Sequence, residues 1–344
     1  MSYTRLITAS PHIRAKTSVQ DIMTDVLIAL TPAAAMAAYY YGIRAITLMV
    51  VSVASAVLFE MLFRLTMKRP LAVSDFSAAV TGLLLAFNLP ASAPFWLPVV
   101  GSFFAIVIVK QLFGGIGQNF VNPALCARAF LLAAYPAQMT DWSVLPFTFN
   151  ATDAVSAATS SAVSAVDAVS AATPLTVMKA AAFFPEQKDF IGALIGNTGG
   201  CIGEGCAVAL FAGGLYLIIR RVISWRIPFT YIFTFIIVAL LFGRHGAGGP
   251  GANPFSLPLY EVITGGMLLG AFFMATDYTT SPVTPAGQIV MGAGCGILTA
   301  IIRFRGGYPE GVSYSILLMN LSVPLIERIT KPRVYGVGKG GSGN

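Results

Sequence analysis

Charged residues are scarce in this chain of 344 residues. Asp, Glu, Lys and Arg together make up 10% of the sequence, whereas hydrophobic residues make up 56%. Soluble domains carry roughly 25% charged residues, so this composition excludes a water-soluble globular protein. We therefore expect an integral membrane protein that has membrane lipid around it.

Motifs for metals and nucleotides are also missing. The four cysteines, at positions 126, 201, 206 and 295, have no CxxC spacing, so we expect no zinc or iron–sulfur site in this chain. They are interpreted as small buried hydrophobes, with a cluster shared with another subunit as the alternative. No GxGxxG stands between a strand and a helix, which argues against NAD binding.

The net charge of +7 does not form the basic face of a nucleic-acid-binding protein. The basic residues sit in short clusters between apolar runs, as in the cytoplasmic loops of membrane proteins. We predict no nucleic-acid partner. We also predict no cleavable signal peptide, because the first twenty residues lack an apolar core. The main clusters are Arg64, Lys68 and Arg69; Arg220, Arg221 and Arg226; and Arg328, Lys331 and Arg333.

Long apolar runs fill most of the chain. A membrane-spanning helix needs roughly 20 apolar residues, and on this basis ten segments are predicted. The third and fifth segments are short, and such helices are tolerated only where protein or a cavity satisfies their backbone groups. The fold class is therefore an all-α polytopic membrane protein. The segments lie near 22–41, 44–66, 77–90, 94–113, 120–136, 203–220, 226–243, 258–275, 285–302 and 308–328.

The distribution of basic residues predicts the orientation. With the N-terminus inside, the three basic clusters all fall on the cytoplasmic side, so both termini are expected in the cytoplasm. The predicted regions are a cytoplasmic N-terminal segment (1–21), a first transmembrane half (22–136), an extracytoplasmic loop (137–200), a second transmembrane half (201–328) and a cytoplasmic tail (329–344).

The two transmembrane halves resemble each other. Asn88-Leu89-Pro90, Gly101, Lys110 and Gly114-Gly115 are echoed, at a nearly constant offset, by Thr280-Ser281-Pro282, Gly292, Arg303 and Gly306-Gly307. Each half holds five segments, an odd number, so the halves must have opposite orientations. Two inverted five-helix repeats are typical of transporter-like folds, whose ligands bind at the repeat interface.

The predicted extracytoplasmic loop contains a low-complexity run that would ordinarily indicate a flexible Ala/Ser linker. Within it, the unit Asp-Ala-Val-Ser-Ala-Ala-Thr occurs twice, ending at Thr159 and at Thr173. The unit resembles the acceptor motif for covalent FMN attachment. A phosphoester bond needs a hydroxyl group, which the threonine supplies, and small neighbours allow close approach to the backbone.

With this motif, the chain resembles the RnfD family, whose members belong to the Rnf complex, the ion-translocating ferredoxin:NAD oxidoreductase. It is similar, more distantly, to the NqrB component of the sodium-translocating NADH:quinone oxidoreductase. The short N-terminus fits the Rnf component better. The matching stretches follow one another along nearly the whole chain: 10–14 (SPHIR), 77–86, 113–136 (FGGIGQNFVNPALCARAFLLAAYP), 170–175 (SAATPL), 199–205 (GGCIGEG), 220–228 (RRVISWRIP) and 273–282 (FMATDYTTSP).

The resemblance implies a cofactor at Thr173, which Pro174-Leu175 follows as in the family, and which would carry a covalent FMN. Thr159 is followed by Ser160-Ser161 and is interpreted as a duplication within the loop. A second, noncovalent flavin, riboflavin, is implied within the helices.

The resemblance also implies partners and a location. The partners are other subunits of the Rnf complex, including an extracytoplasmic FMN subunit and iron–sulfur membrane subunits. The location is the bacterial cytoplasmic (inner) membrane. The chain would relay electrons between flavins and would not be catalytic alone.

Four residues are candidates for binding the flavin within the helices, and a fifth is a candidate for ion coupling. Asn119 and Asn122 offer amides that match the donors and acceptors of a flavin ring, or they are helix caps. Arg128 lies in an apolar segment and must pair with a carboxylate or an anionic flavin. Glu204 either lines a flavin or complements a helix dipole. Asp277 is a candidate for ion coupling, or a helix-end carboxylate in the headgroup region.

Two rival functions remain open. A channel or permease explains the inverted repeat but leaves the flavin acceptor unit without a purpose. The quinone-reducing relative predicts the same flavins with a different electron acceptor.

Overall fold

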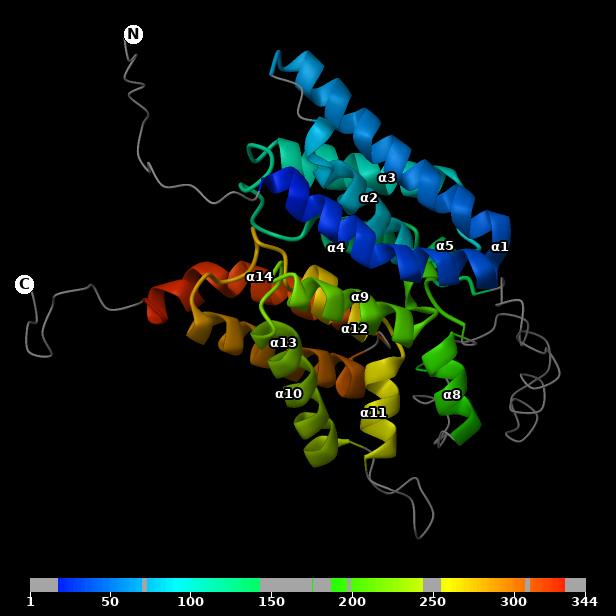
Figure 1. Ribbon diagram of the computed structural model, residues 1–344, viewed down its shortest axis with the longest axis vertical. Helices are drawn as coiled ribbons and strands as arrows, with labels where there is room; N and C mark the ends of the chain where they lie inside the picture. The colour runs from blue at the N-terminus through cyan, green and yellow to red at the C-terminus, as the bar shows by residue number, and fades with distance from the viewer. Residues whose placement is uncertain are drawn as a thin grey trace, which may run out of the picture.

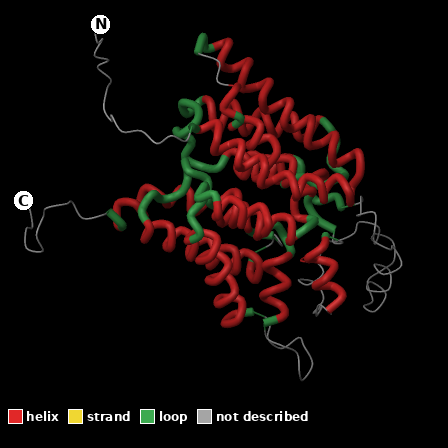
Figure 2. The backbone as a smooth tube through the Cα atoms, viewed as in Figure 1, coloured by secondary structure: helices red, strands yellow, loops and turns green. Residues whose placement is uncertain are grey.

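The computed structural model describes residues 18–69, 73–142, 175, 187–196, 199–243, 255–306 and 310–331. All regular elements within these ranges are helices (Figure 1, Figure 2). Among the described residues, one isolated β-bridge joins Pro90 to Cys201. Thr159 and Thr173 lie outside the described residues.

The first helix, α1 (Val19–Thr66), contains two of the predicted segments. It begins with a capping box, in which Ser18 Oγ accepts from the Asp21 amide at 3.2 Å and Asp21 accepts from the Ser18 amide at 2.8 Å. The helix is interrupted at Gly42, whose φ of 64° and ψ of −150° are not helical. In Figure 1, α1 doubles back on itself. The break divides 48 residues, about 72 Å of helix, into two pieces that each suit a bilayer.

The rest of the first half consists of short helices. The 3-10 turn η1 (Val73–Asp75) precedes α2 (Ser77–Phe87), which ends at Asn88. Then α3 (Trp96–Phe103) continues as a π-helix, η2 (Phe104–Gln111). They are followed by α4 (Pro123–Ala134) and the short α5 (Pro136–Met139), each with proline in its first turn, where a missing amide hydrogen costs nothing.

The second half begins after α8 (Gln187–Ile195) with the 3-10 turn η3 (Ile202–Glu204). The helices α9 (Ala207–Ile219), α10 (Arg226–Phe242), α13 (Pro285–Arg305) and α14 (Val312–Ile329) match predicted segments. Between α10 and α13, α11 (Ser256–Ile263) is followed by α12 (Met267–Leu269) and the π-helix η4 (Gly270–Met274). The chain bends by 66° between α11 and α12, where Gly265 and Gly266 adopt φ of 71° and 67°.

Helix length and composition show which single helices can cross a membrane. Among the described helices, α1, α13 and α14 are long and apolar enough to cross a membrane, and the bent pair from α11 to η4 adds a fourth. The other apolar helices are 10–17 residues long, so they need neighbouring protein to satisfy their ends. The prediction of an all-helical membrane protein is confirmed for the described residues.

The two halves form adjoining layers. In Figure 1, α1 to α4 (blue to cyan) lie above α10 to α14 (olive to red). Contacts join the layers where α1 meets α9, α4 meets α14, and α2 meets η3. All four cysteines are free, and Cys201, Cys206 and Cys295 are buried, as their interpretation as small hydrophobes predicts.

Candidate functional site

A cavity of about 100 Å³ lies where the two halves meet. Apolar side chains of α1, α2, α9 and η4 form most of its lining, and the loops that flank α4 and follow η4 contribute polar groups. Three of the residues predicted from the sequence line it together: Asn119, Asn122 and Asp277. The fold therefore brings into one place side chains that are more than 150 residues apart.

Asn119 connects the two polar loops of the cavity. Its amide nitrogen donates to Thr279 Oγ1 at 2.8 Å and to the Val121 carbonyl at 3.1 Å. Both bonds are made by the amide nitrogen, so Asn119 ties the loop before α4 to the turn after η4.

Asn122 is the N-cap of α4. Its Oδ1 accepts from the amides of Ala124 and Leu125 at 3.0 and 3.3 Å, and its amide nitrogen donates to the Met274 carbonyl at 3.2 Å. Of the two interpretations that the sequence leaves open, the structure shows the helix cap, on the wall of the cavity.

Asp277 lies in the turn that follows η4. Its carboxylate accepts from the hydroxyls of Thr279 and Thr280 at 3.0 and 3.4 Å. Through Thr279, the carboxylate joins the same hydrogen-bonded group as Asn119. The residue is therefore held inside the protein by its neighbours, next to the cavity.

Lys110 on the cavity wall belongs to a buried ion pair with Glu60 that the sequence patterns did not reveal. Lys110 Nζ donates to Glu60 Oε2 at 3.1 Å and to Ser77 Oγ at 2.6 Å. Glu60 Oε1 accepts from Gln111 at 2.7 Å and from Arg64 at 3.1 Å. The available signal was a carboxylate and an ammonium in apolar segments, where ionisable groups are rare and usually functional.

The second polar centre surrounds Arg128, six residues after Asn122 and so about 9 Å further along α4. Its Nη1 donates to Asn88 Oδ1 at 2.7 Å. Its Nη2 donates to the Glu310 carboxylate and lies 3.6 Å from Cys201 Sγ. The side chain of Arg128 is 8% exposed. Of the two predicted partners, a carboxylate or an anionic flavin, the structure shows a carboxylate, that of Glu310, which the sequence did not single out.

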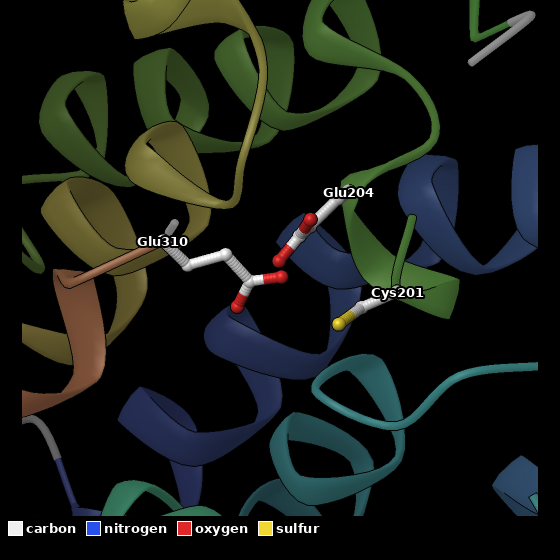
Figure 3. Close-up of side chains that lie close together, drawn as sticks. All are labelled: Cys201, Glu204 and Glu310. Atoms are coloured by element: carbon white, nitrogen blue, oxygen red, sulfur yellow. The ribbon is translucent and has the colours of Figure 1, made fainter. Parts of the chain in front are cut away.

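Glu204 also belongs to this centre, but its pairing is incomplete. Its Oε1 lies 3.9 Å from Arg128 Nη1, beyond hydrogen-bonding distance, and has no hydrogen-bond partner among the described residues. The sulfur of Cys201 and carboxylate oxygens of Glu204 and Glu310 all lie within 4.8 Å of one another. Figure 3 shows the three side chains converging on one space from η3 and from the segment before α14.

Arg303 lies beside this centre on α13. It donates to the backbone carbonyls of Glu310, Gly265 and Glu261 at 3.0, 3.2 and 2.5 Å. It therefore fixes the bend between α11 and α12 to the loop that carries Glu310. Leu175 is 6% exposed and packs against the same bend, because a Cβ added to Gly265 would collide with its side chain.

These features define a class: a multi-pass, all-helical membrane protein with two buried polar centres where its halves meet. A family model described as the NQR2, RnfD, RnfE family matches residues 6–336. The chain belongs to this family.

Relatives that match along almost their full length are D-type components of redox complexes. The chain is 51% identical over 335 residues to the D component of the Na(+)-translocating ferredoxin:NAD(+) oxidoreductase complex of Acetobacterium woodii, covering 97% of this chain and 96% of the relative. It is 40% identical over 337 residues to the D component of the proton-translocating ferredoxin:NAD(+) oxidoreductase complex of Clostridium ljungdahlii, covering 96% of each. It is 37% identical to the D component of the ion-translocating oxidoreductase complex of Halorhodospira halophila, covering 96% of this chain and 95% of the relative.

Proposed function

We propose that the chain is the flavin-carrying membrane subunit of an ion-translocating ferredoxin:NAD oxidoreductase complex. The observation that carries the proposal is the full-length match to relatives that are named as components of such complexes. In this role the chain relays electrons and works only with the other subunits. Those partners include an extracytoplasmic FMN subunit and iron–sulfur membrane subunits.

The covalent FMN is assigned to Thr173. The support is the acceptor unit, which Pro174 and Leu175 follow, together with the burial of Leu175 against Gly265. A flavin on Thr173 would thus be attached near the centre formed by Arg128, Glu204 and Arg303.

Riboflavin is assigned to the cavity beside α4. Flavins carry out one- and two-electron transfer, and the protein's task is to position the ring and tune its potential. The lining suits such a ring, with apolar walls that include Phe272 and Phe273 and a polar edge that includes Asn119 and Asp277. The cavity is smaller than the roughly 300–1,000 Å³ of most ligand pockets, so binding requires lining side chains to move.

The proposed topology is ten membrane helices in two inverted repeats, with both termini in the cytoplasm of the bacterial inner membrane. Its support is the agreement between the predicted segments and the helices. Three further features agree with it: the break at Gly42, which separates the first two spans, the end of α2 at Asn88, and the 66° bend before α12. Breaks within a span, like the last two, lie at the midplane sites of inverted-repeat transporters.

In-gel fluorescence of the denatured chain under ultraviolet light tests the covalent flavin. The wild type is compared with Thr173→Ala and Thr159→Ala after co-expression with a flavin transferase. We expect a fluorescent band that only Thr173→Ala removes. Absence of the band from the wild type, with the transferase active on a control protein, would reject covalent flavinylation and favour a permease.

A further inference from the structure

The two carboxylates near Arg128 carry more negative charge than their partner neutralises. Glu204 and Glu310 contribute two carboxylates, and Arg128 contributes one guanidinium. Arg303 donates its hydrogen bonds to the backbone carbonyls of Glu310, Glu261 and Gly265 and not to either carboxylate. With neutral Cys201, the centre thus has room for one further positive charge.

An independent observation shows where that charge would bind. Glu204 Oε1 is buried and has no hydrogen-bond partner among the described residues, on a side chain that is 6% exposed. Leaving a buried acceptor unsatisfied costs about 1–3 kcal/mol, and more for a charged group. We therefore expect that Glu204 Oε1 has a bound partner in another state of the protein.

The geometry suits a small cation. The ligand atoms of Cys201, Glu204 and Glu310 lie within 4.8 Å of one another. An ion with metal–oxygen bonds of roughly 2.3–2.6 Å, as Ca²⁺ has and Na⁺ of similar radius also has, can bridge two oxygens at that separation. A proton shared between the two carboxylates would supply the same charge.

We propose that Glu204 and Glu310 form a binding site for one monovalent cation, Na⁺ or a proton. Arg128 competes with this cation for the Glu310 carboxylate. The site is separate from Asp277, which lies at the cavity. When the cation is absent, Arg128 holds Glu310 and Cys201. When it binds, Glu204 Oε1 gains its partner, Glu310 is shared, and Arg128 keeps its bond to Asn88.

The position of the site gives cation binding a structural consequence. Arg128 belongs to α4 of the first half, whereas Glu204 and Glu310 belong to the second. A cation that weakens the link from Arg128 to Glu310 loosens a contact between the halves. The inference rests on the proposed role in ion translocation and deepens it, but cation binding is measurable without any flavin chemistry.

Several charged or ionisable groups face this site. They come from the elements packed around it: Arg128 of α4, Cys201 before η3, Tyr41 of α1, and Arg303 of α13. Substitutions are therefore made at the carboxylates themselves, which alone among these groups provide the proposed oxygen ligands.

Infrared difference spectroscopy on the purified complex tests the proposal. Spectra are recorded in NaCl minus choline chloride, and separately at low minus high pH without Na⁺. The wild type is compared with Glu204→Gln, with Glu310→Gln as the second variant, and with Asp25→Asn as control. Asp25 is a carboxylate paired with Arg220 at 3.2 Å at the protein surface.

We expect a carboxylate difference band that Glu204→Gln and Glu310→Gln both abolish and Asp25→Asn retains. A band in the Na⁺ spectrum identifies Na⁺ as the ligand, and a band only in the pH spectrum identifies the proton. Identical spectra for the wild type and Glu204→Gln under both conditions would overturn the proposal. Flavin fluorescence of the same samples reports separately on the proposed redox function.

Discussion

At the scale of single residues, buried charges and the partners that neutralise them define the polar centres of this protein. Arg128 illustrates how far a sequence can lead. An arginine in an apolar segment must have a partner, but the partner, Glu310, is 182 residues away. No local pattern connects the two positions, because the pairing depends on how α4 packs against α14.

Removal of the charge of Arg128 should lower the stability of the protein. Arg128→Leu leaves Glu204 and Glu310 buried without a counter-charge, and breaking a buried ion pair in this way costs about 3–5 kcal/mol. Thermal unfolding in detergent should show a large decrease in stability. The double variant Arg128→Leu with Glu310→Gln should recover part of it, and no recovery would mean that the ion pair is not the cause.

At the scale of elements, the helices follow from the apolar runs, and their ends follow from capping and proline. Ser18 and Asp21 form a capping box, Asn122 caps α4 with Pro123 in the first turn, and Thr284 caps α13 in the same way. These signals are local, but of these caps only Asn122 was named as a candidate from the sequence. The π-helical stretches Phe104–Gln111 and Gly270–Met274 have no such signal and were not predicted.

The cap of α4 offers a direct test at this scale. Asn122→Ala removes the acceptor for two amides and should cost about 1 kcal/mol. Asn122→Ser keeps a side-chain acceptor and should restore part of the loss, although the bond to the Met274 carbonyl is gone. Thermal unfolding of both variants, together with the riboflavin content of the purified complex, separates a cap from a flavin ligand. A loss of riboflavin in Asn122→Ser at a stability close to that of the wild type would show that the amide nitrogen contacts the flavin.

Close packing of α10 against α13 depends on glycine. A Cβ at Gly296 would lie 2.7 Å from the Tyr231 carbonyl oxygen and 2.9 Å from the Phe235 amide nitrogen. Gly296→Ala should therefore push the helices apart and cost about 1–3 kcal/mol. Gly294→Ala is the matched control on the same helix, since its nearest neighbour is the flexible end of Met319. Equal melting temperatures for the two variants would contradict this account.

At the scale of the whole molecule, the two halves enclose their polar centres between them. The cavity lined by Asn119 and Asp277 and the centre at Arg128 both form where one half meets the other. The family membership and the full-length relatives agree with a component of an ion-translocating complex. An odd number of spans in each half, as proposed, places equivalent helices in opposite orientations.

The proposed orientation can be tested with reporter fusions. A C-terminal fusion should be active with a cytoplasmic reporter and inactive with a periplasmic one, because the basic cluster at Arg328 and Lys331 remains on the cytoplasmic side. A fusion within residues 143–174 should give the opposite result. The same reporter active at both places would rule out the proposed topology.

The membrane environment, most of the helices and the family could be predicted from the sequence alone. Scarce charge and long apolar runs require a membrane, and caps, prolines and glycines mark the ends of helices within a few residues. The sequence also identified Arg128, Glu204, Asn119 and Asp277 as candidate site residues, Arg128 because an unpaired cation in an apolar segment is costly.

Which of these groups lie next to one another is seen only in the tertiary structure. It separated Arg128 and Glu204 from Asn119 and Asp277, added Glu310 and Cys201 to the first centre, and placed the ion pair of Glu60 and Lys110 at the cavity wall. The physical reason is that each centre is built from helices and loops of both halves. Their meeting depends on packing between segments far apart in the chain, which no local pattern encodes.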